Sequence, residues 1–275
     1  MVGNGSRRGA CDRPRRGATM TLRDLCWRVE ETCFNAFPSL QQVLFAGWLL
    51  RFAEGVSRRA NSLNPLDPEC ADAVAAVALA EALYHARGQP AIVRVPSLVD
   101  PQFDRALAAR FYTAEGGSCV LYGALDAVAA AADPAVILLR SADAEWLDAM
   151  SRLQRHTPAQ GSVYARIVGA IAIPARFAMI SVEGVPPALA YGAIHDGLLC
   201  YESVITGPRH RRRGLARRVI AALASWAKEA GAEGVCLQVE AGNAPARALY
   251  ASFGLSELYR YHYRREPSGG DRPRT

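Results

Sequence analysis

The most informative segment is Glu202-Ser-Val-Ile-Thr-Gly-Pro-Arg-His-Arg-Arg-Arg-Gly-Leu-Ala216, in the C-terminal half of the chain. It begins as the end of a predicted β-strand over 198–206, and a basic turn then leads directly into a predicted helix over 213–230. The first backbone N–H groups of a helix have no partner inside the helix, and the helix dipole places partial positive charge there. This order of elements predicts a binding site for a pyrophosphate.

Small and basic residues at the helix entry fit that ligand. Gly214 has no Cβ, so phosphates can approach the backbone closely, and Ala216 keeps the next turn shallow. Arg212, Arg213 and Arg217 can donate charge-assisted hydrogen bonds to phosphate oxygens. The alternative for the same arginines is a solvated basic loop or a nucleic-acid contact. The glycine and the alanine favour the pyrophosphate.

Composition and charge narrow the classes of protein. The 275 residues are 51% hydrophobic and carry a net charge of +6. The arginines of residues 1–20 and 264–275 account for that excess and leave the middle of the chain neutral overall, whereas a nucleic-acid-binding protein usually carries its basic excess on a folded face. No apolar run approaches the ~20 residues that a membrane-spanning helix needs. Neither a nucleic-acid partner nor a membrane is expected.

The cysteines and the first residues bear on the compartment. Seven cysteines lie at positions 11, 26, 33, 70, 119, 200 and 236, without a CxxC or a Cys/His ligand spacing. This pattern fits a reducing cytosol and argues against a structural zinc, so no metal site is predicted. Residues 1–20 lack the apolar core of a secretory signal and are predicted to be a disordered leader, with Met20 as a candidate start. The expected localisation is cytoplasmic.

Two similar successions of elements follow one another along the chain. The first is predicted to hold a helix from Thr21, strands at 43–53, 55–63, 91–95 and 118–125, helices at 70–87 and 100–110, and a turn at Gly116-Gly117. The second is predicted to hold strands at 136–139, 174–183, 187–196, 198–206 and 235–239, an extended segment at 255–263, helices at 143–153, 160–169, 213–230 and 244–253, and turns at Gly184 and Asp196-Gly197. The shared order suggests a diverged duplication with a boundary near 130–135.

A family resemblance is carried by the C-terminal motifs. Arg211-x-x-Gly214-x-Ala216 resembles the Q/R-x-x-G-x-G/A signature of the GNAT superfamily of N-acetyltransferases, and Pro208 lies where that family places V-x-P-x-x-R. Gln238-Val-Glu-x-x-Asn243-x-x-Ala246-x-x-Leu249-Tyr250-x-x-Phe253-Gly254 follows at the family's spacing, and a Tyr-rich strand over 259–263 closes the chain. The resemblance covers roughly 134–265.

The N-terminal half has the family's order of elements but no phosphate-loop signature, and it is similar to the degenerate first repeat of tandem GNAT proteins. The resemblance implies an α/β (α+β) fold of tandem GNAT-like domains, with a mixed, mostly antiparallel sheet flanked by helices and a splayed strand at the cofactor site. The expected organisation is a disordered leader at 1–20, a degenerate GNAT-like domain at 21–130, a catalytic GNAT domain at 134–265 and a disordered tail at 266–275.

The resemblance also implies roles for individual residues. Acetyl-CoA would be the co-substrate, with the pantetheine arm on the backbone of the splayed strand, the pyrophosphate on the helix entry and an asparagine reaching the cofactor arm. The residues implied are Val204, Ile205, Thr206, Arg211, Arg212, Arg213, Gly214, Leu215, Ala216, Arg217 and Asn243. Tyr250 would protonate the departing CoA thiolate; a packed core aromatic is the other interpretation. Asn243 is in any case expected to cap its helix.

The reaction would be direct attack of an amine on the thioester, which requires a general base or a water chain. Glu202 is the candidate base, because period-2 alternation keeps it on the same face of its strand as Thr206. An ion-paired strand carboxylate is the alternative for Glu202. Gln238 occupies a position where some members of the family carry Glu, so the identity of the base stays open.

The predicted function is transfer of an acetyl group to a primary amine on a small molecule or a peptide N-terminus. Transfer of a longer acyl chain and a non-catalytic acyl-CoA sensor or scaffold are the alternatives. The oligomeric state stays open, with a homodimer as one candidate. In the N-terminal half, a cluster either lines the acceptor site or packs as structure, with packing favoured: Trp48, Arg51, Asn61 and Ser62.

Overall fold

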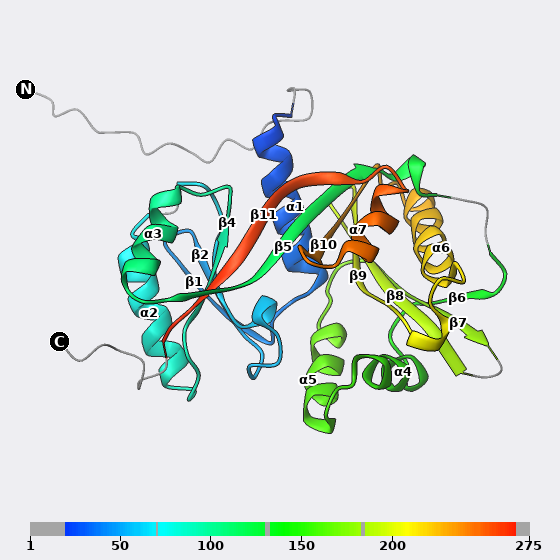
Figure 1. Ribbon diagram of the computed structural model, residues 1–275, viewed down its shortest axis with the longest axis horizontal. Coiled ribbons are helices and arrows are strands. Elements are labelled where there is room, and N and C mark those ends of the chain that lie inside the picture. The colour runs from blue at the N-terminus through cyan, green and yellow to red at the C-terminus, as the bar shows by residue number, and fades with distance from the viewer. Residues whose placement is uncertain (1–19, 70, 130–132, 183–184, 268–275) are drawn as a thin grey trace, which may run out of the picture.

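The computed structural model describes residues 20–69, 71–129, 133–182 and 185–267. Their strands form one eleven-stranded sheet in the order β1-β2-β3-β4-β11-β5-β10-β9-β8-β7-β6. Figure 1 shows the N-terminal half on the left and the C-terminal half on the right, with β5 and β11 crossing between them. Two of the printed strand pairs, β3 with β4 and β9 with β10, are parallel, and the others are antiparallel. The expected mixed, mostly antiparallel sheet is confirmed.

The bounds of the elements follow the predicted succession. The first half contains α1 (Leu22–Ala36), β1 (Gln41–Phe45), β2 (Trp48–Phe52), β3 (Leu63–Pro65), α2 (Ala73–His85), β4 (Ile92–Pro96), α3 (Pro101–Ala109) and β5 (Thr113–Ala124). The second half contains β6 (Val136–Leu139), α4 (Ala144–Gln154), α5 (Pro158–Gly169), β7 (Ala175–Val182), β8 (Val185–His195), β9 (Leu198–Thr206), α6 (Leu215–Glu229), β10 (Gly234–Glu240), α7 (Ala244–Ala251) and β11 (Ser256–Arg265).

The two halves exchange their last strands. In each half, a parallel pair of strands encloses a helix: β3 and β4 with α2, and β9 and β10 with α6. The strand that ends the first half, β5, pairs with β10 of the second half, and β11 pairs with β4 and β5 of the first. The sheet therefore runs without a break from one half to the other, and residues of both halves meet at its centre.

Helices from both halves cover the C-terminal part of the sheet. Helix α1 begins at a capping box between Thr21 and Asp24 and packs on β8, β9 and β10 of the other half. Helix α6 packs against β6, β7, β8 and β9, through an apolar side that includes Leu215, Val219 and Leu223. Each such side chain contributes about 1.5–3 kcal/mol when buried. The phosphate-loop helix is therefore fixed to the sheet by its apolar side.

Three predictions on the first half were wrong. The single strand expected over 43–53 is a hairpin, because Ala46 and Gly47 both adopt positive φ, at 46° and 83°, as a two-residue hairpin turn requires. The extended piece expected over 55–63 contains a 3-10 turn at Arg58–Ala60. The turn expected at Gly116-Gly117 lies inside β5, where β11 and β5 shift register.

Some predictions concern residues that the structure does not describe. These are the leader before Met20, the turn at Gly184 and the tail from residue 268. Residues 130–132, beside the expected boundary, are also outside it, so the domain limits stay predictions. Glu266 is buried at 5% exposure, and its backbone N–H donates to the carbonyl of Ala91. Among the described helices, none is both long and apolar enough to cross a membrane.

Candidate functional site

The parallel pair β9 and β10 separates at the point where the chemistry is predicted. The strands pair from Leu198 with Gly234 to Tyr201 with Leu237, and no pairing between them continues beyond that point. On its other side β9 shifts register against β8, and Ser203 adopts a positive φ of 53°. A bulge of this kind bends one strand away from its neighbour. The backbone of residues 202–206 therefore has a free edge toward β10, which confirms the expected splayed strand.

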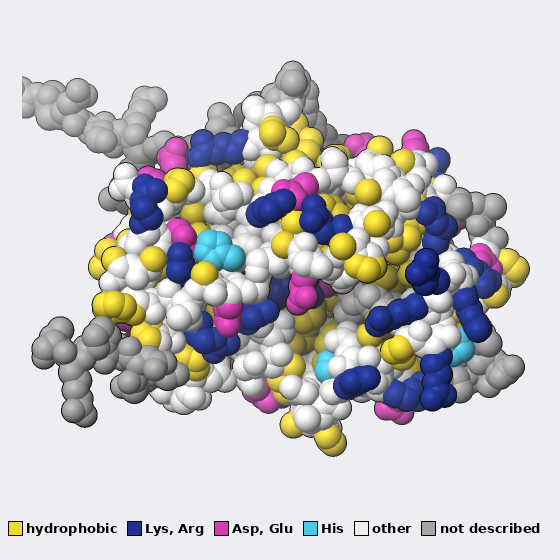
Figure 2. Space-filling model, viewed as in Figure 1, with side chains coloured by type: hydrophobic (Ala, Val, Ile, Leu, Met, Phe, Trp, Pro, Cys, Tyr) yellow, Lys and Arg dark blue, Asp and Glu magenta, His cyan; other side chains and the backbone are white. Residues whose placement is uncertain are grey.

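The loop that follows leaves the start of α6 open. Gly214 is the N-cap residue, with a φ of 77° and no side-chain cap. A Cβ added at Gly214 would meet no atom within 4 Å. Arg211, Arg212 and Arg213 are exposed, and Figure 2 shows basic side chains gathered over this loop, at the lower right of the face. The first N–H groups of α6 thus face solvent beside several positive charges, as an anion site requires.

The other predicted loop residues differ in what they do. Leu215 is buried at 7% exposure in the core under α6, so its side chain packs and does not reach solvent. Ala216 is half-buried. Arg217 donates to the Ser252 hydroxyl and lies 4.3 Å from the centre of the Phe253 ring, so the end of α7 holds it. Its charge remains at the edge of the open helix start.

Helix α7 lies beside the start of α6, since its C-terminal end contacts Arg217. Asn243 caps α7 by accepting a hydrogen bond from the Ala246 backbone N–H at 3.2 Å, which confirms its expected structural role. Tyr250 is 6% exposed and packs in the same core as α6. Burial raises the pKa of Tyr250, and the nearby Glu202 carboxylate raises it further. Its hydroxyl therefore keeps its proton through neutral and moderately alkaline pH.

The predicted base, Glu202, is engaged by an arginine of the other half. The side chain of Glu202 is 2% exposed, and Arg59 donates to both of its oxygens, at 2.6 and 2.7 Å. Burial raises the pKa of Glu202, while the Arg59 guanidinium opposes that shift. Removing one partner of such a buried pair costs about 3–5 kcal/mol, because the other charge is left uncompensated. The pair joins the two halves beside the point where β9 and β10 separate.

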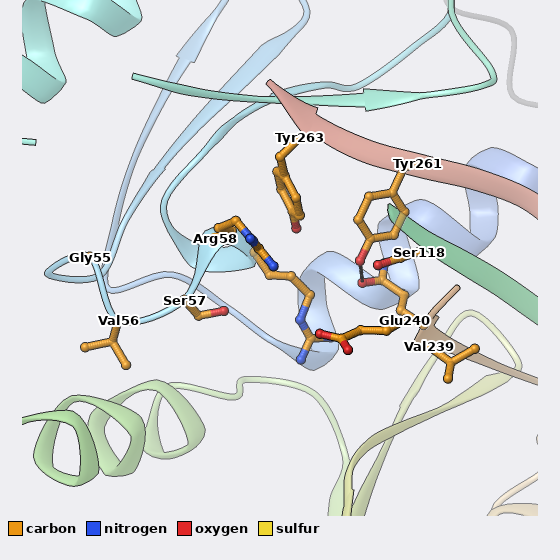
Figure 3. A pocket seen from close by; sticks show the side chains of 11 residues that line it. Gly55, Val56, Ser57, Arg58, Ser118, Val239, Glu240, Tyr261 and Tyr263 are labelled. Carbon is orange, nitrogen blue, oxygen red and sulfur yellow. Dashed lines mark hydrogen bonds between the residues drawn. The ribbon is translucent and has the colours of Figure 1, made fainter. Parts of the chain in front are cut away.

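A pocket of about 480 Å³ opens between the halves at the same place. Figure 3 shows its side chains, and the space-filling view in Figure 2 is hollowed near the centre of this face. Its lining comes from a loop of the first half and from strands β5, β10 and β11: Gly55, Val56, Ser57, Arg58, Arg59, Ser118, Gln238, Val239, Glu240, Tyr261 and Tyr263. This volume lies in the range of small-molecule sites. The pocket adjoins the splay, because Gln238 directly follows the last residue of β10 that pairs with β9.

The N-terminal cluster around Trp48 is packed inside the fold, which is the alternative that the sequence favoured over a place in the acceptor site. Trp48, Arg51, Asn61 and Ser62 are all at most 3% exposed, and none of them lines the pocket. The side-chain oxygen of Asn61 accepts from the backbone N–H groups of Ala53 and Gly55, at 2.7 and 2.9 Å. Asn61 therefore fixes the loop that carries the pocket wall without facing the pocket itself.

Sequence reasoning missed the pocket residues of the first half and one grouping of thiols. Arg58 and Arg59 carry no local motif, and only the pairing of distant strands brings them to the splay. Cys33, Cys200 and Cys236, scattered along the chain, have sulfur atoms within 4.8 Å of one another. No spacing along the chain could have indicated that grouping, because it joins α1 to β9 and β10.

Comparisons with known proteins agree with this architecture. The uncharacterized N-acetyltransferase YobR of Bacillus subtilis (strain 168) is 27% identical over 245 residues, which cover 86% of this chain and 97% of that protein. The GCN5-related N-acetyltransferase from Kribbella flavida has a TM-score of 0.66 at 18% identity, over 92% of this chain and 98% of that one. A tandem GNAT protein from the clavulanic acid biosynthesis pathway has a TM-score of 0.56 at 16% identity, over 71% of this chain and 70% of that one.

A mixed sheet with a splayed parallel pair, and an open basic helix start beside the splay, together characterise a GNAT-type N-acetyltransferase, and the relatives bear this class out. The family model described as "Probable histone acetyltransferase Rv0428c C-terminal" matches residues 25–264. The chain belongs to that family. The match spans both halves, so the N-terminal half is part of what the family model describes.

Proposed function

We propose that the protein transfers an acetyl group from acetyl-CoA to a primary amine by direct attack. The observation that carries this proposal is the open start of α6, where Gly214 provides no side-chain cap beside Arg211, Arg212 and Arg213. A helix start of this kind binds a pyrophosphate through backbone N–H groups and arginine side chains. The free edge of β9 lies directly upstream of it in the chain.

The cofactor would lie along β9 and over the start of α6. The pantetheine amides would pair with the backbone of Val204, Ile205 and Thr206, which have no strand partner on the β10 side. The pyrophosphate would lie on residues 211–217, and Asn243 at the start of α7 would reach the cofactor arm. In this arrangement the thioester reaches the splay, next to the pocket between the halves.

Proton transfers complete the reaction. The amine nitrogen forms a bond to the thioester carbon, and the carbon–sulfur bond breaks with its electron pair on sulfur. Tyr250 would give its proton to that thiolate, since its hydroxyl carries a proton at neutral pH and the amino group of the substrate does not compete for it once the base has taken the amine proton. A backbone N–H of the splayed strand would polarise the thioester oxygen.

Two carboxylates compete for the role of base. Burial raises the pKa of Glu202, the direction that makes a carboxylate a better proton acceptor, but its ion pair with Arg59 opposes that shift and occupies both carboxylate oxygens. Glu240, exposed at the end of β10, lines the pocket. The first half of the chain would thus have two tasks, holding Glu202 through Arg59 and forming a wall of the acceptor pocket.

The test measures acetyl-CoA binding by calorimetry and acetylation of an amine panel by mass spectrometry. We expect Tyr250→Phe to bind acetyl-CoA as the wild type does and to lose about 100-fold or more in kcat, in line with general acid catalysis. Equal kcat in this variant would remove the acid role. Binding without acetylation of any amine would favour the sensor. The pH–rate profile of Glu240→Gln distinguishes the two carboxylates. If this variant loses the acidic limb of the profile, Glu240 and not Glu202 is the base.

A further inference from the structure

The pocket wall holds a buried hydroxyl without a partner. Tyr263 in β11 is 2% exposed, and its hydroxyl oxygen forms no hydrogen bond within the described part of the chain. Leaving a buried polar group unpaired costs about 1–3 kcal/mol, so native proteins satisfy nearly all such groups. Figure 3 shows this hydroxyl directed into the pocket. It is available to a bound molecule as a hydrogen-bond donor.

Arg58 brings positive charge to the same end of the pocket. Its guanidinium carbon lies 5.3 Å from the centre of the Tyr263 ring, and Figure 3 shows the two side chains next to one another. The contact of Arg58 with Glu115 is long, at 3.6 Å, and Glu115 also pairs with Arg265 at 3.1 Å. The charge of Arg58 is therefore only partly neutralised. Arg59, in contrast, is committed to Glu202.

The backbone makes room for this arginine. Gly116 has a φ of 61°, and a Cβ placed there would lie 2.7 Å from Nη2 of Arg58. That separation is shorter than a non-bonded contact allows, so a glycine is required for the guanidinium to lie where it does. The register of β11 against β5 shifts between Tyr261 and Tyr263, at the same point. Such irregularities re-aim side chains toward a site.

The rest of the lining is rich in donors. The Tyr261 hydroxyl donates to Oε1 of Gln238 at 3.0 Å, which leaves the amide nitrogen of Gln238 as a donor. Ser57 adds a hydroxyl group, whereas the Ser118 hydroxyl donates to the Gly116 carbonyl at 3.4 Å. Glu240 is the carboxylate of the lining, on the strand that forms the splay. Donors thus surround one end of the pocket, and a single acid lies toward the predicted position of the thioester.

We infer that the acceptor is an amine that also carries a carboxylate, such as an amino acid or a short peptide with free ends. Arg58 and Tyr263 bind the carboxylate, and the amine lies toward Gln238 and Glu240. A guanidinium fork and a hydroxyl are matched to carboxylate oxygens. This inference rests on the proposed function, because the pocket is taken to be the acceptor side of the transfer.

The test compares a dipeptide with its C-terminal amide, a pair that differs chiefly in the carboxylate charge. We expect the wild type to acetylate the free acid with a kcat/KM about ten-fold higher or more. Arg58→Ala and Tyr263→Phe are expected to shrink that preference with unchanged acetyl-CoA affinity. Tyr263→Phe should melt no lower than the wild type, because the hydroxyl has no intramolecular partner to lose. Arg166→Ala, which breaks an exposed pair with Glu54 outside the pocket, is the matched control.

A second readout keeps the two proposals apart. Binding of N-acetyl dipeptide acids and amides in the presence of CoA is measured by calorimetry, which needs no turnover. A preference for the acid that Arg58→Ala removes and Arg166→Ala keeps supports a carboxylate site at Arg58 and Tyr263. Absence of turnover in the same preparation would then count against the proposed function and not against this site. Equal binding of acid and amide, no binding of either, or preference for a lysine-rich basic peptide overturns it, while acetyl-CoA binding and amine acetylation can still stand.

Discussion

Helices α2 and α6 occupy equivalent places in the two halves, yet an acidic residue caps the start of α2, whereas arginines surround the uncapped start of α6. Each helix joins two parallel neighbouring strands, and each begins at an N-cap residue with a left-handed backbone. At α2 that residue is Asp72, with a φ of 52°, whose carboxylate accepts from the Ala75 backbone N–H at 3.1 Å. At α6 it is Gly214, without a side chain.

The different N-cap residues, Asp72 at α2 and Gly214 at α6, make only the start of α6 suitable for a phosphate. A carboxylate at a helix start occupies the place where a phosphate would bind, and it already neutralises the positive end of the dipole. The loop before α2 adds Asp67 and Glu69, whereas the loop before α6 is a run of arginines and one histidine over 209–213. The same strand–helix–strand frame is thus closed to anions in one half and open in the other.

The largest effect is expected when α6 receives the N-cap residue of α2. Gly214→Asp is expected to weaken acetyl-CoA binding by about 100-fold or more, which corresponds to about 2.7 kcal/mol, because the carboxylate competes with the pyrophosphate. The fold should persist with a loss of about 1–2 kcal/mol for a side chain at positive φ, because a Cβ at 214 meets no atom within 4 Å and aspartate tolerates a left-handed backbone, as Asp72 does at the start of α2. Calorimetric titration with acetyl-CoA measures the effect.

Gly214→Asn is the control for that exchange, because it supplies a similar cap without the charge. A clearly smaller loss of affinity in Gly214→Asn assigns the effect to charge repulsion. Equal losses in both variants would assign it to filling of the helix start by a side chain, and the electrostatic part of the comparison would have to be given up.

A smaller effect is expected from the arginines of the loop. Arg212→Ala and Arg213→Ala should each weaken acetyl-CoA binding by about 5–10-fold, as expected for loss of an exposed charge-assisted hydrogen bond. The loss should shrink as salt is raised, because exposed charges are screened. Acetyl-CoA affinity measured at low and high salt tests this salt dependence. The control is Arg140→Ala, which removes an exposed arginine outside the loop. A loss that does not depend on salt would contradict the electrostatic explanation.

The smallest effect is expected from the reverse exchange. Asp72→Gly removes the carboxylate from the start of α2 and should lower the free energy of unfolding by less than about 1 kcal/mol, because glycine is a tolerable N-cap and adopts the left-handed backbone readily. No second acetyl-CoA site should form, since Asp67 and Glu69 remain in the loop. A binding stoichiometry of two would show that the N-cap alone decides which half binds the cofactor.

The contiguous parts of the molecule were predictable. The strand ending at Thr206, the loop and the helix from Leu215 follow each other directly, and the cap of α7 by Asn243 depends on residues three positions apart. Turn chemistry in the first half was less readable: Ala46 takes a positive φ that its residue type does not favour, and the single predicted strand over 43–53 proved to be a hairpin.

The open start of α6 follows from local sequence, because helix ends are governed by the few residues around the cap and by their charges. The surroundings of that site depend on long-range packing. Arg59 meets Glu202, and Arg58 meets Tyr263, because β5 and β11 are exchanged between the halves and pair across the centre of the sheet. Strand partners far apart in the chain are chosen by the packing of the whole sheet, and no local spacing records that choice.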